Sequence, residues 1–182
     1  MELNFICPHH EHRILRDGVC AAELWHGLST QGKGEAQMSH WAKAASYFGS
    51  ATEVAIIRAS VEQNQTQLDY LNMAMYTGRW LIEAFCQLGD SHSAKRYLNL
   101  TEHNISHLIE REPCIKNSLL SDEKLKASIF NFLQACHANI KHHELSAPYS
   151  SETSSKTPNG SKKNSHLTLV FSKTSAQASA LH

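Results

Sequence analysis

The sequence predicts an all-α protein in which antiparallel helical hairpins form a stack or a small bundle, followed by a disordered C-terminal tail. Through residues 1–143, apolar residues recur three and four positions apart, and nothing in this region reads as a sheet. Beyond Glu144, Ser, Thr, Lys and Asn dominate, with too little apolar surface to offset the entropy lost on folding. The 182 residues therefore divide into a helical domain, residues 1–143, and a disordered tail, residues 144–182.

The first two predicted helices cover residues 17–31 and about residues 35–61. Asp17 can cap the first helix, and the glycines of Gly32-Lys33-Gly34 are expected to end it. The second helix carries two neighbouring apolar rows, a broad face that more than one other helix must cover. Gly49 lies inside this pattern, where it either breaks the helix or lets another backbone approach closely.

The third and fourth predicted helices are joined by a tight turn. Apolar residues three and four apart run from Leu68 to Leu88, and Gly78 on this row can admit a facing helix. Gly89 suits the C-terminal turn of the third helix, and Asp90 suits the N-cap of the fourth. The fourth helix therefore follows the third after a very short connection.

The fifth predicted helix opens at Ser121-Asp122-Glu123 and closes near His143. A capping hydroxyl and two acids suit its N-terminal end, and the cations at residues 141–143 suit its C-terminal end. Pro113 separates it from the fourth helix. Short joints between long helices force neighbours to pack antiparallel. The apolar rows exceed what one small bundle needs, so a homodimer is also expected.

The two helices on either side of the Gly-Asp turn carry a repeat-like pattern. The residues that carry it are Leu81, Phe85, Gly89, Asp90, Ala94 and Leu98. Small Ala94 lets the two helices approach, while Phe85 and Leu98 fill the space between them. Residues 75–108 thereby resemble a tetratricopeptide repeat, with a weak echo at residues 125–135. Ile82, Gly78 and Ser106 stand where that family has Gly, Trp and Pro.

The resemblance implies a protein–protein interaction module, an adaptor or scaffold that binds a partner peptide or helix in a helical groove. In such stacks the binding residues face inward from the first helix of each hairpin. On the third predicted helix, the row opposite to the core row consists of Asn72, Tyr76, Arg79, Glu83 and Gln87. These five residues are the predicted partner-binding site.

Composition and motifs argue against several other classes of protein. Acids and bases balance at 17 each, which disfavours a nucleic-acid partner. No apolar run is long enough to span a membrane, and the five cysteines form no CxxC pair, so reduced thiols in the cytoplasm are expected. No serine elbow, Walker loop, dinucleotide fingerprint or HExxH helix is present, so the protein is not expected to be an enzyme and no resident cofactor is implied.

The segment Cys7-Pro8-His9-His10-Glu11-His12 supports a different hypothesis, a metal-binding or metal-sensing helical protein. Thiolate and imidazole groups are ligands that zinc prefers. His9 and His12 would share a face if the segment is helical, and Cys20 is near enough to add a further ligand. Under this alternative the metal ligands are Cys7, His9 and His12; otherwise the segment is a polar lead-in to the first helix.

Overall fold

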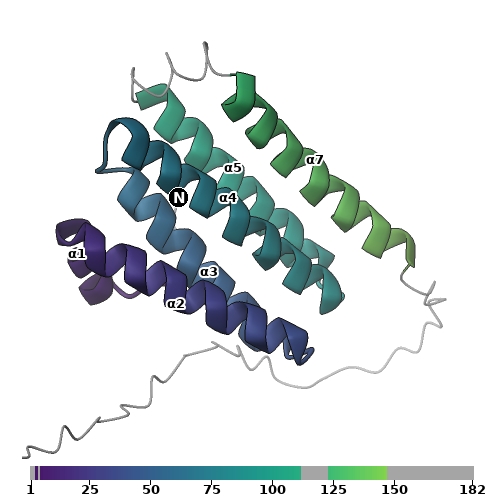
Figure 1. The fold of residues 1–182 in the computed structure, drawn as a ribbon. Coiled ribbons are helices and arrows are strands. Elements are labelled where there is room, and N and C mark those ends of the chain that lie inside the picture. The colour runs from purple at the N-terminus through teal and green to yellow at the C-terminus, as the bar shows by residue number, and fades with distance from the viewer. Residues whose placement is uncertain (1–2, 4, 112–122, 147–182) are drawn as a thin grey trace, which may run out of the picture. The chain divides into compact units, whose positions relative to one another are not determined.

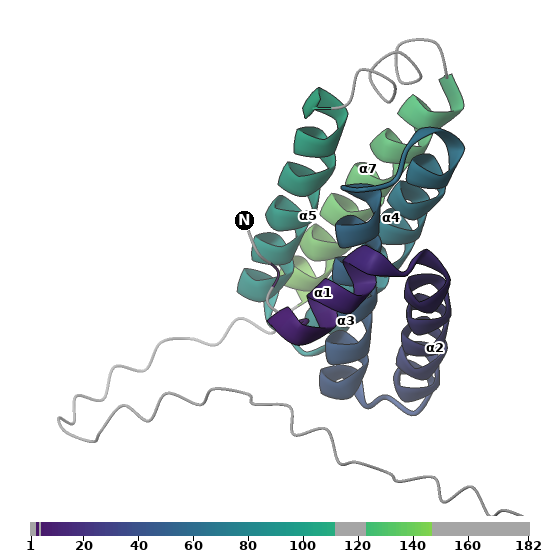
Figure 2. The same cartoon turned by 90° about the vertical axis from the view of Figure 1, so that its left-hand side faces the viewer.

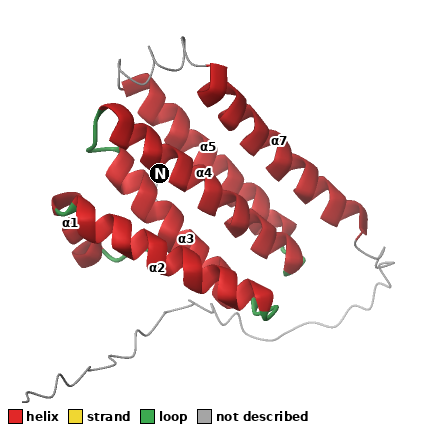
Figure 3. Cartoon of the chain, in the orientation of Figure 1, coloured by secondary structure: helices red, strands yellow, loops and turns green. Residues whose placement is uncertain are grey.

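The computed structural model describes residues 3, 5–111 and 123–146, and every element in these ranges is a helix (Figure 1, Figure 3). The helices are α1 (Pro8–Arg16), α2 (Gly18–Gln37), α3 (Trp41–Ala59), α4 (Asn64–Gln87), α5 (Ser91–Arg111) and α7 (Glu123–Ser146). The predicted all-α class is confirmed. The last helix continues past residue 143 to Ser146, and the rest of the predicted disordered tail lies outside the described residues.

Helix α4 lies at the centre of this arrangement. It packs against α3, α5 and α7, while α2 packs on another side of α3 (Figure 1, Figure 2). Short connections at residues 38–40, 60–63 and 88–90 make α2, α3, α4 and α5 successive hairpins. The largest core cluster is contributed mainly by α3, α4, α5 and α7, and its largest members include Leu71, Ile82, Leu98, Phe132 and Ile140. As the two apolar rows predicted, more than one helix covers α3.

Helix α1 has no counterpart among the predicted helices. Pro8 occupies its first turn, where the missing N–H costs nothing, and Arg13 and Arg16 lie in its last turn. Only Ile14 of this helix is buried. Its nine residues carry only two aliphatic side chains, Ile14 and Leu15, which are too few to form a recurring apolar row.

The boundary predicted between the first two helices is wrong. Helix α2 continues through Gly32-Lys33-Gly34 to Gln37, and α3 begins at Trp41. A Cβ atom at Gly32 would lie 2.8 Å from a ring carbon of Phe48, so this glycine provides room for the core rather than a stop. The chain turns instead at Ser39, whose φ of 59° is in the left-handed region.

Two other glycines allow close approach between elements. Helix α3 passes through Gly49 unbroken, and the ring of Phe5 rests there, 2.4 Å from where a Cβ atom would stand. Of the two alternatives predicted for Gly49, the helix break is absent, and the close approach is made by a side chain rather than a backbone. At Gly78 a Cβ atom would lie 3.3 Å from the Thr101 side chain and 3.7 Å from the Phe132 ring. Gly78 thus admits α5 and α7, as predicted.

The turn between α4 and α5 has the expected chemistry. Gly89 adopts a φ of 71°, and the Asp90 carboxylate accepts a hydrogen bond of 2.9 Å from the backbone N–H of Ser93. This hydrogen bond lowers the pKa of Asp90. The predicted stop and restart of the helix is confirmed.

Candidate interaction surface on α4

The predicted partner-binding row lies on one face of α4. Asn72, Tyr76, Arg79 and Gln87 are exposed, and Glu83 is half-buried. Spacings of three and four residues keep them on one side of the helix, while the intervening residues Leu71, Met75 and Ile82 enter the core. Tyr76 is the one large aromatic residue of this row, and it is 41% exposed.

Helix α2 borders the surface at Tyr76. The ring centroids of Tyr76 and Trp25 are 6.4 Å apart, and the Lys33 ammonium nitrogen lies 5.0 Å from the Tyr76 ring centroid. These distances allow an aromatic pair and a cation–π interaction. The Trp25 indole N–H is buried and has no hydrogen-bond partner among the described residues. Neither Trp25 nor Lys33 belongs to the predicted partner-binding row.

Helix α7 borders the surface at Glu83. One carboxylate oxygen of Glu83 accepts a hydrogen bond of 2.7 Å from the Gln87 side chain, and the other accepts one from the Asn139 side chain on α7. Glu83 is therefore held by α7 within the fold. Asn139 is 56 residues away in the chain, and no local pattern identifies it.

The N-terminal Cys/His segment forms the start of α1. The Cys7 thiol lies 3.0 Å from Nδ1 of His10, a residue outside the predicted ligand set. His9 and His12 are exposed on α1, and Cys20 lies on α2, where its backbone N–H bonds to Asp17. Within the part of the chain that the structure describes, no three His, Cys, Asp or Glu side chains are grouped to hold a metal ion. Zinc at Cys7, His9 and His12 stays a prediction.

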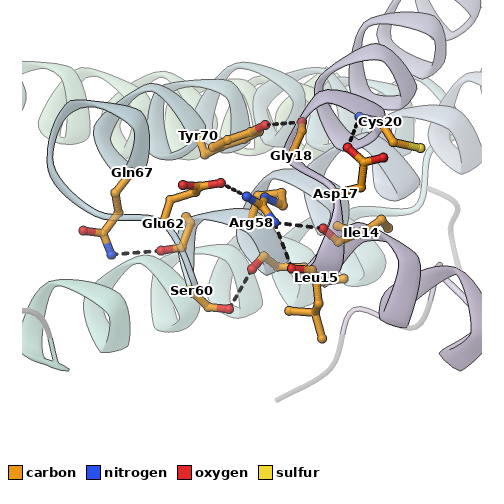
Figure 4. A network of polar contacts seen from close by, with 12 residues as sticks. Ile14, Leu15, Asp17, Gly18, Cys20, Arg58, Ser60, Glu62, Gln67 and Tyr70 are labelled. Carbon is orange, nitrogen blue, oxygen red and sulfur yellow. Dashed lines mark hydrogen bonds and ion pairs between the residues drawn. The ribbon is translucent and has the colours of Figure 1, made fainter.

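A second polar cluster joins α1 to α3 (Figure 4). The guanidinium of buried Arg58 donates hydrogen bonds of 3.1 Å and 3.0 Å to the carbonyl oxygens of Ile14 and Leu15, and it pairs with the Glu62 carboxylate. The Tyr70 hydroxyl donates a hydrogen bond of 3.1 Å to the carbonyl oxygen of Gly18. This cluster satisfies backbone groups at the end of one helix and the start of the next, which is a structural role.

The two cysteines in the core are poorly suited to nucleophilic chemistry. Cys86 on α4 and Cys136 on α7 are 2% and 1% exposed. Burial raises the pKa of Cys86 to about 11 and that of Cys136 to about 12. At neutral pH both are protonated thiols that behave as small apolar side chains.

No protein-family model matches the chain. Comparisons with curated proteins and with solved structures also found no match. None of the helices in the described ranges combines the length and the apolar character of a membrane-spanning segment. The resemblance to a tetratricopeptide repeat stays a prediction, and function has to be argued from the surface of α4.

Proposed function

We propose that this protein is a non-enzymatic interaction module that binds a partner protein through the exposed face of α4. The observation that carries the proposal is the position of Tyr76, which is 41% exposed while Trp25 and Lys33 from α2 contact its ring. Tyr, Trp and Arg are the residues most enriched among those that dominate binding energy at protein interfaces. Arg79 is exposed one turn further along the same face.

The contacts of Tyr76 also favour binding because they restrict its motion. A side chain already held by neighbouring groups loses less entropy when a partner immobilises it. A peptide or helix on this face would contact an aromatic pair at one end and the Glu83–Gln87 hydrogen bond at the other.

Partner capture with matched variants tests this proposal. The tagged full-length chain is recovered from its native cells, and bound proteins are quantified by mass spectrometry for wild type, Tyr76→Ala, Arg79→Ala and Phe130→Ala. Phe130 on α7 is 58% exposed, so its replacement removes an exposed aromatic ring of similar size. It is nine positions from Asn139, which places the two on opposite faces of α7.

The expected result is one partner recovered in stoichiometric amount, with at least about tenfold weaker binding for Tyr76→Ala and Arg79→Ala, as loss of 1.4 kcal/mol per site implies. Phe130→Ala is expected to bind as wild type does. Equal recovery of the partner by all four chains would exclude the α4 face as the binding surface.

We further propose that the protein acts in the cytoplasm. The four cysteines at described positions, Cys7, Cys20, Cys86 and Cys136, are free thiols, which supports a reducing compartment. Fluorescence microscopy of the tagged chain tests this, and a signal confined to a secretory compartment would contradict it.

Metal binding is the second candidate, supported by the two donor atoms of Cys7 and His10 that lie 3.0 Å apart. Elemental analysis of the purified full-length chain tests it. Stoichiometric zinc that disappears in Cys7→Ser would support this candidate, and a metal content unchanged by that substitution would remove it.

A further inference from the structure

The N-terminal arm, residues 3 and 5–16, lies along a face of α3 (Figure 2). Both ends of this arm are held by side chains of α3, and both bind its backbone. At the first end, one Glu53 carboxylate oxygen accepts hydrogen bonds of 2.6 Å and 2.7 Å from the backbone N–H groups of Phe5 and Ile6. Successive N–H groups point to opposite sides of an extended strand, so one oxygen that accepts both holds a bent stretch of backbone rather than a particular side chain.

The ring of Phe5 supplies the side-chain part of this recognition. It rests on Gly49 of α3, and its centroid lies 5.2 Å from that of Tyr97 on α5. The Tyr97 ring is stacked in turn on Phe85 of α4 at 5.0 Å. Gly49, the stacked rings of Tyr97 and Phe85, and the Glu53 carboxylate together form a binding site for one aromatic residue and its following peptide group.

At the other end of the arm, Arg58 binds the carbonyl oxygens of Ile14 and Leu15 (Figure 4). Helix α3 therefore presents a negative group to the N–H groups that precede α1 and a positive group to the carbonyl groups that end it. This order complements the dipole of α1. The contacts specify the direction of a bound segment and leave most of its side chains unconstrained.

The helical part of the arm contributes little to the core, since Ile14 is the one buried residue of α1, whereas Phe5 and Ile6 before it pack against core clusters. Leu3 and Ile14 are its only described residues that are buried, and α1 is joined to α2 through a single extended residue, Asp17. Segments with few buried apolar contacts open locally at a lower free energy than the whole domain. Release of the arm would expose Gly49, Tyr97 and the Glu53 carboxylate without separating α3 from α4 or α5.

We propose that the face of α3 and α5 formed by Gly49, Glu53 and Tyr97 is a second docking site, which the arm covers as an intramolecular ligand. Its partner is a protein segment that carries an aromatic side chain and bends there, so that two successive backbone N–H groups face Glu53 as those of Phe5 and Ile6 do. The arm competes with that segment. This site shares no residue with the proposed row on α4.

A peptide-binding measurement tests the proposal on the full-length chain. The probe is a fluorescent peptide of residues 1–16 with Cys7→Ser, which prevents disulfide exchange. Its affinity is compared for wild type, Phe5→Ala and the double variant Phe5→Ala with Gly49→Ala. In the double variant the new methyl group would lie 2.4 Å from the position of the Phe5 ring, which is too close for the ring of the peptide to bind there.

Phe5→Ala weakens the competing arm and is expected to bind the peptide at least about tenfold more tightly than wild type, because a larger fraction of the site is open. The double variant is expected to lose that gain in affinity, since the methyl group added at residue 49 excludes the ring of the peptide. Equal affinity of wild type and Phe5→Ala, or no detectable binding to either, would overturn the proposal and make the arm a fixed part of the fold.

Hydrogen exchange of the wild-type chain provides a measurement that needs no variant to fold. The amides of Phe5, Ile6 and α1 are expected to exchange at least about 100-fold faster than those in the middle of α4, through local opening. Exchange of the arm and of α4 at one common rate would mean that the arm leaves only when the domain unfolds, which would also overturn the proposal.

Discussion

Gly32→Ala and Gly27→Ala, two substitutions in the same helix, are expected to change stability in different directions. Alanine is favoured over glycine in a helix interior by about 1 kcal/mol, and both sites share this gain. A Cβ atom at Gly27 meets nothing within 4 Å, whereas one at Gly32 would lie 2.8 Å from the ring of Phe48. That ring is 0% exposed and stacked on Trp80 at 5.6 Å, so it has no free space to move into.

Overpacking of this kind costs about 1–3 kcal/mol. Gly27→Ala is therefore expected to raise the free energy of unfolding by about 0.5–1 kcal/mol, and Gly32→Ala to lower it by about 0–2 kcal/mol. Urea titrations followed by circular dichroism measure both values. The m value, which is the slope of the free energy of unfolding against urea concentration, is expected to be unchanged. If Gly32→Ala stabilised the chain as much as Gly27→Ala, the argument that Gly32 provides room for Phe48 would be wrong.

Three further substitutions or modifications test other contacts. Arg58→Met removes the donor that binds the carbonyl groups ending α1, and the free energy of unfolding in urea is expected to fall by about 2 kcal/mol. Asp90→Ala removes the cap of α5 and is expected to cost about 1 kcal/mol at neutral pH. Hydrogen bonding lowers the pKa of this carboxyl group in the folded chain. Its contribution to stability is therefore present above the unfolded pKa and is lost as pH falls through the folded pKa. In acid, the free energies of unfolding of wild type and Asp90→Ala should become equal. Iodoacetamide is expected to label exposed Cys7 in the folded chain, but Cys86 and Cys136 only after unfolding, as mass spectrometry of peptides would show.

Each of these expectations has an outcome that contradicts it. An Arg58→Met chain as stable as wild type would mean that the end of α1 needs no donor from α3. A stability difference for Asp90→Ala that persists in acid would show that the charge of the carboxylate contributes nothing. Labelling of Cys86 at the rate of Cys7 in folded protein would contradict the burial of α4 against α7.

Helices with a continuous apolar row were predictable, and the one without such a row was not. The rows of α4 and α5 and the turn at Gly89 and Asp90 follow from local spacing and turn chemistry. Helix α1 buries only Ile14, and its ends are held by Glu53 and Arg58, which are distant in the sequence. Its local signals were a proline at the first helical position, the acidic Glu11 in the first turn and basic residues in the last turn.

The α2–α3 turn was predicted at the wrong position because the sequence does not show which of two roles a glycine has. A glycine can end a helix by adopting a positive φ, or it can make room for a neighbouring side chain. Gly89 does the first, at a φ of 71°, while Gly32 and Gly49 do the second, against Phe48 and Phe5. The difference depends on what lies opposite the glycine in the fold, and no helical period contains that information.

The same limit applies to the candidate binding row, whose members differ in how freely they can meet a partner. Helical spacing places Tyr76 and Glu83 on one face but does not show that Glu83 already accepts hydrogen bonds from Gln87 and from Asn139 on α7. A partner that displaced those hydrogen bonds would have to replace them, since a half-buried carboxylate that loses its donors is destabilised. The ring of Tyr76 can be covered without breaking any hydrogen bond. Binding energy on this face should therefore concentrate at Tyr76 and Arg79, with Glu83 fixing the distance between α4 and α7.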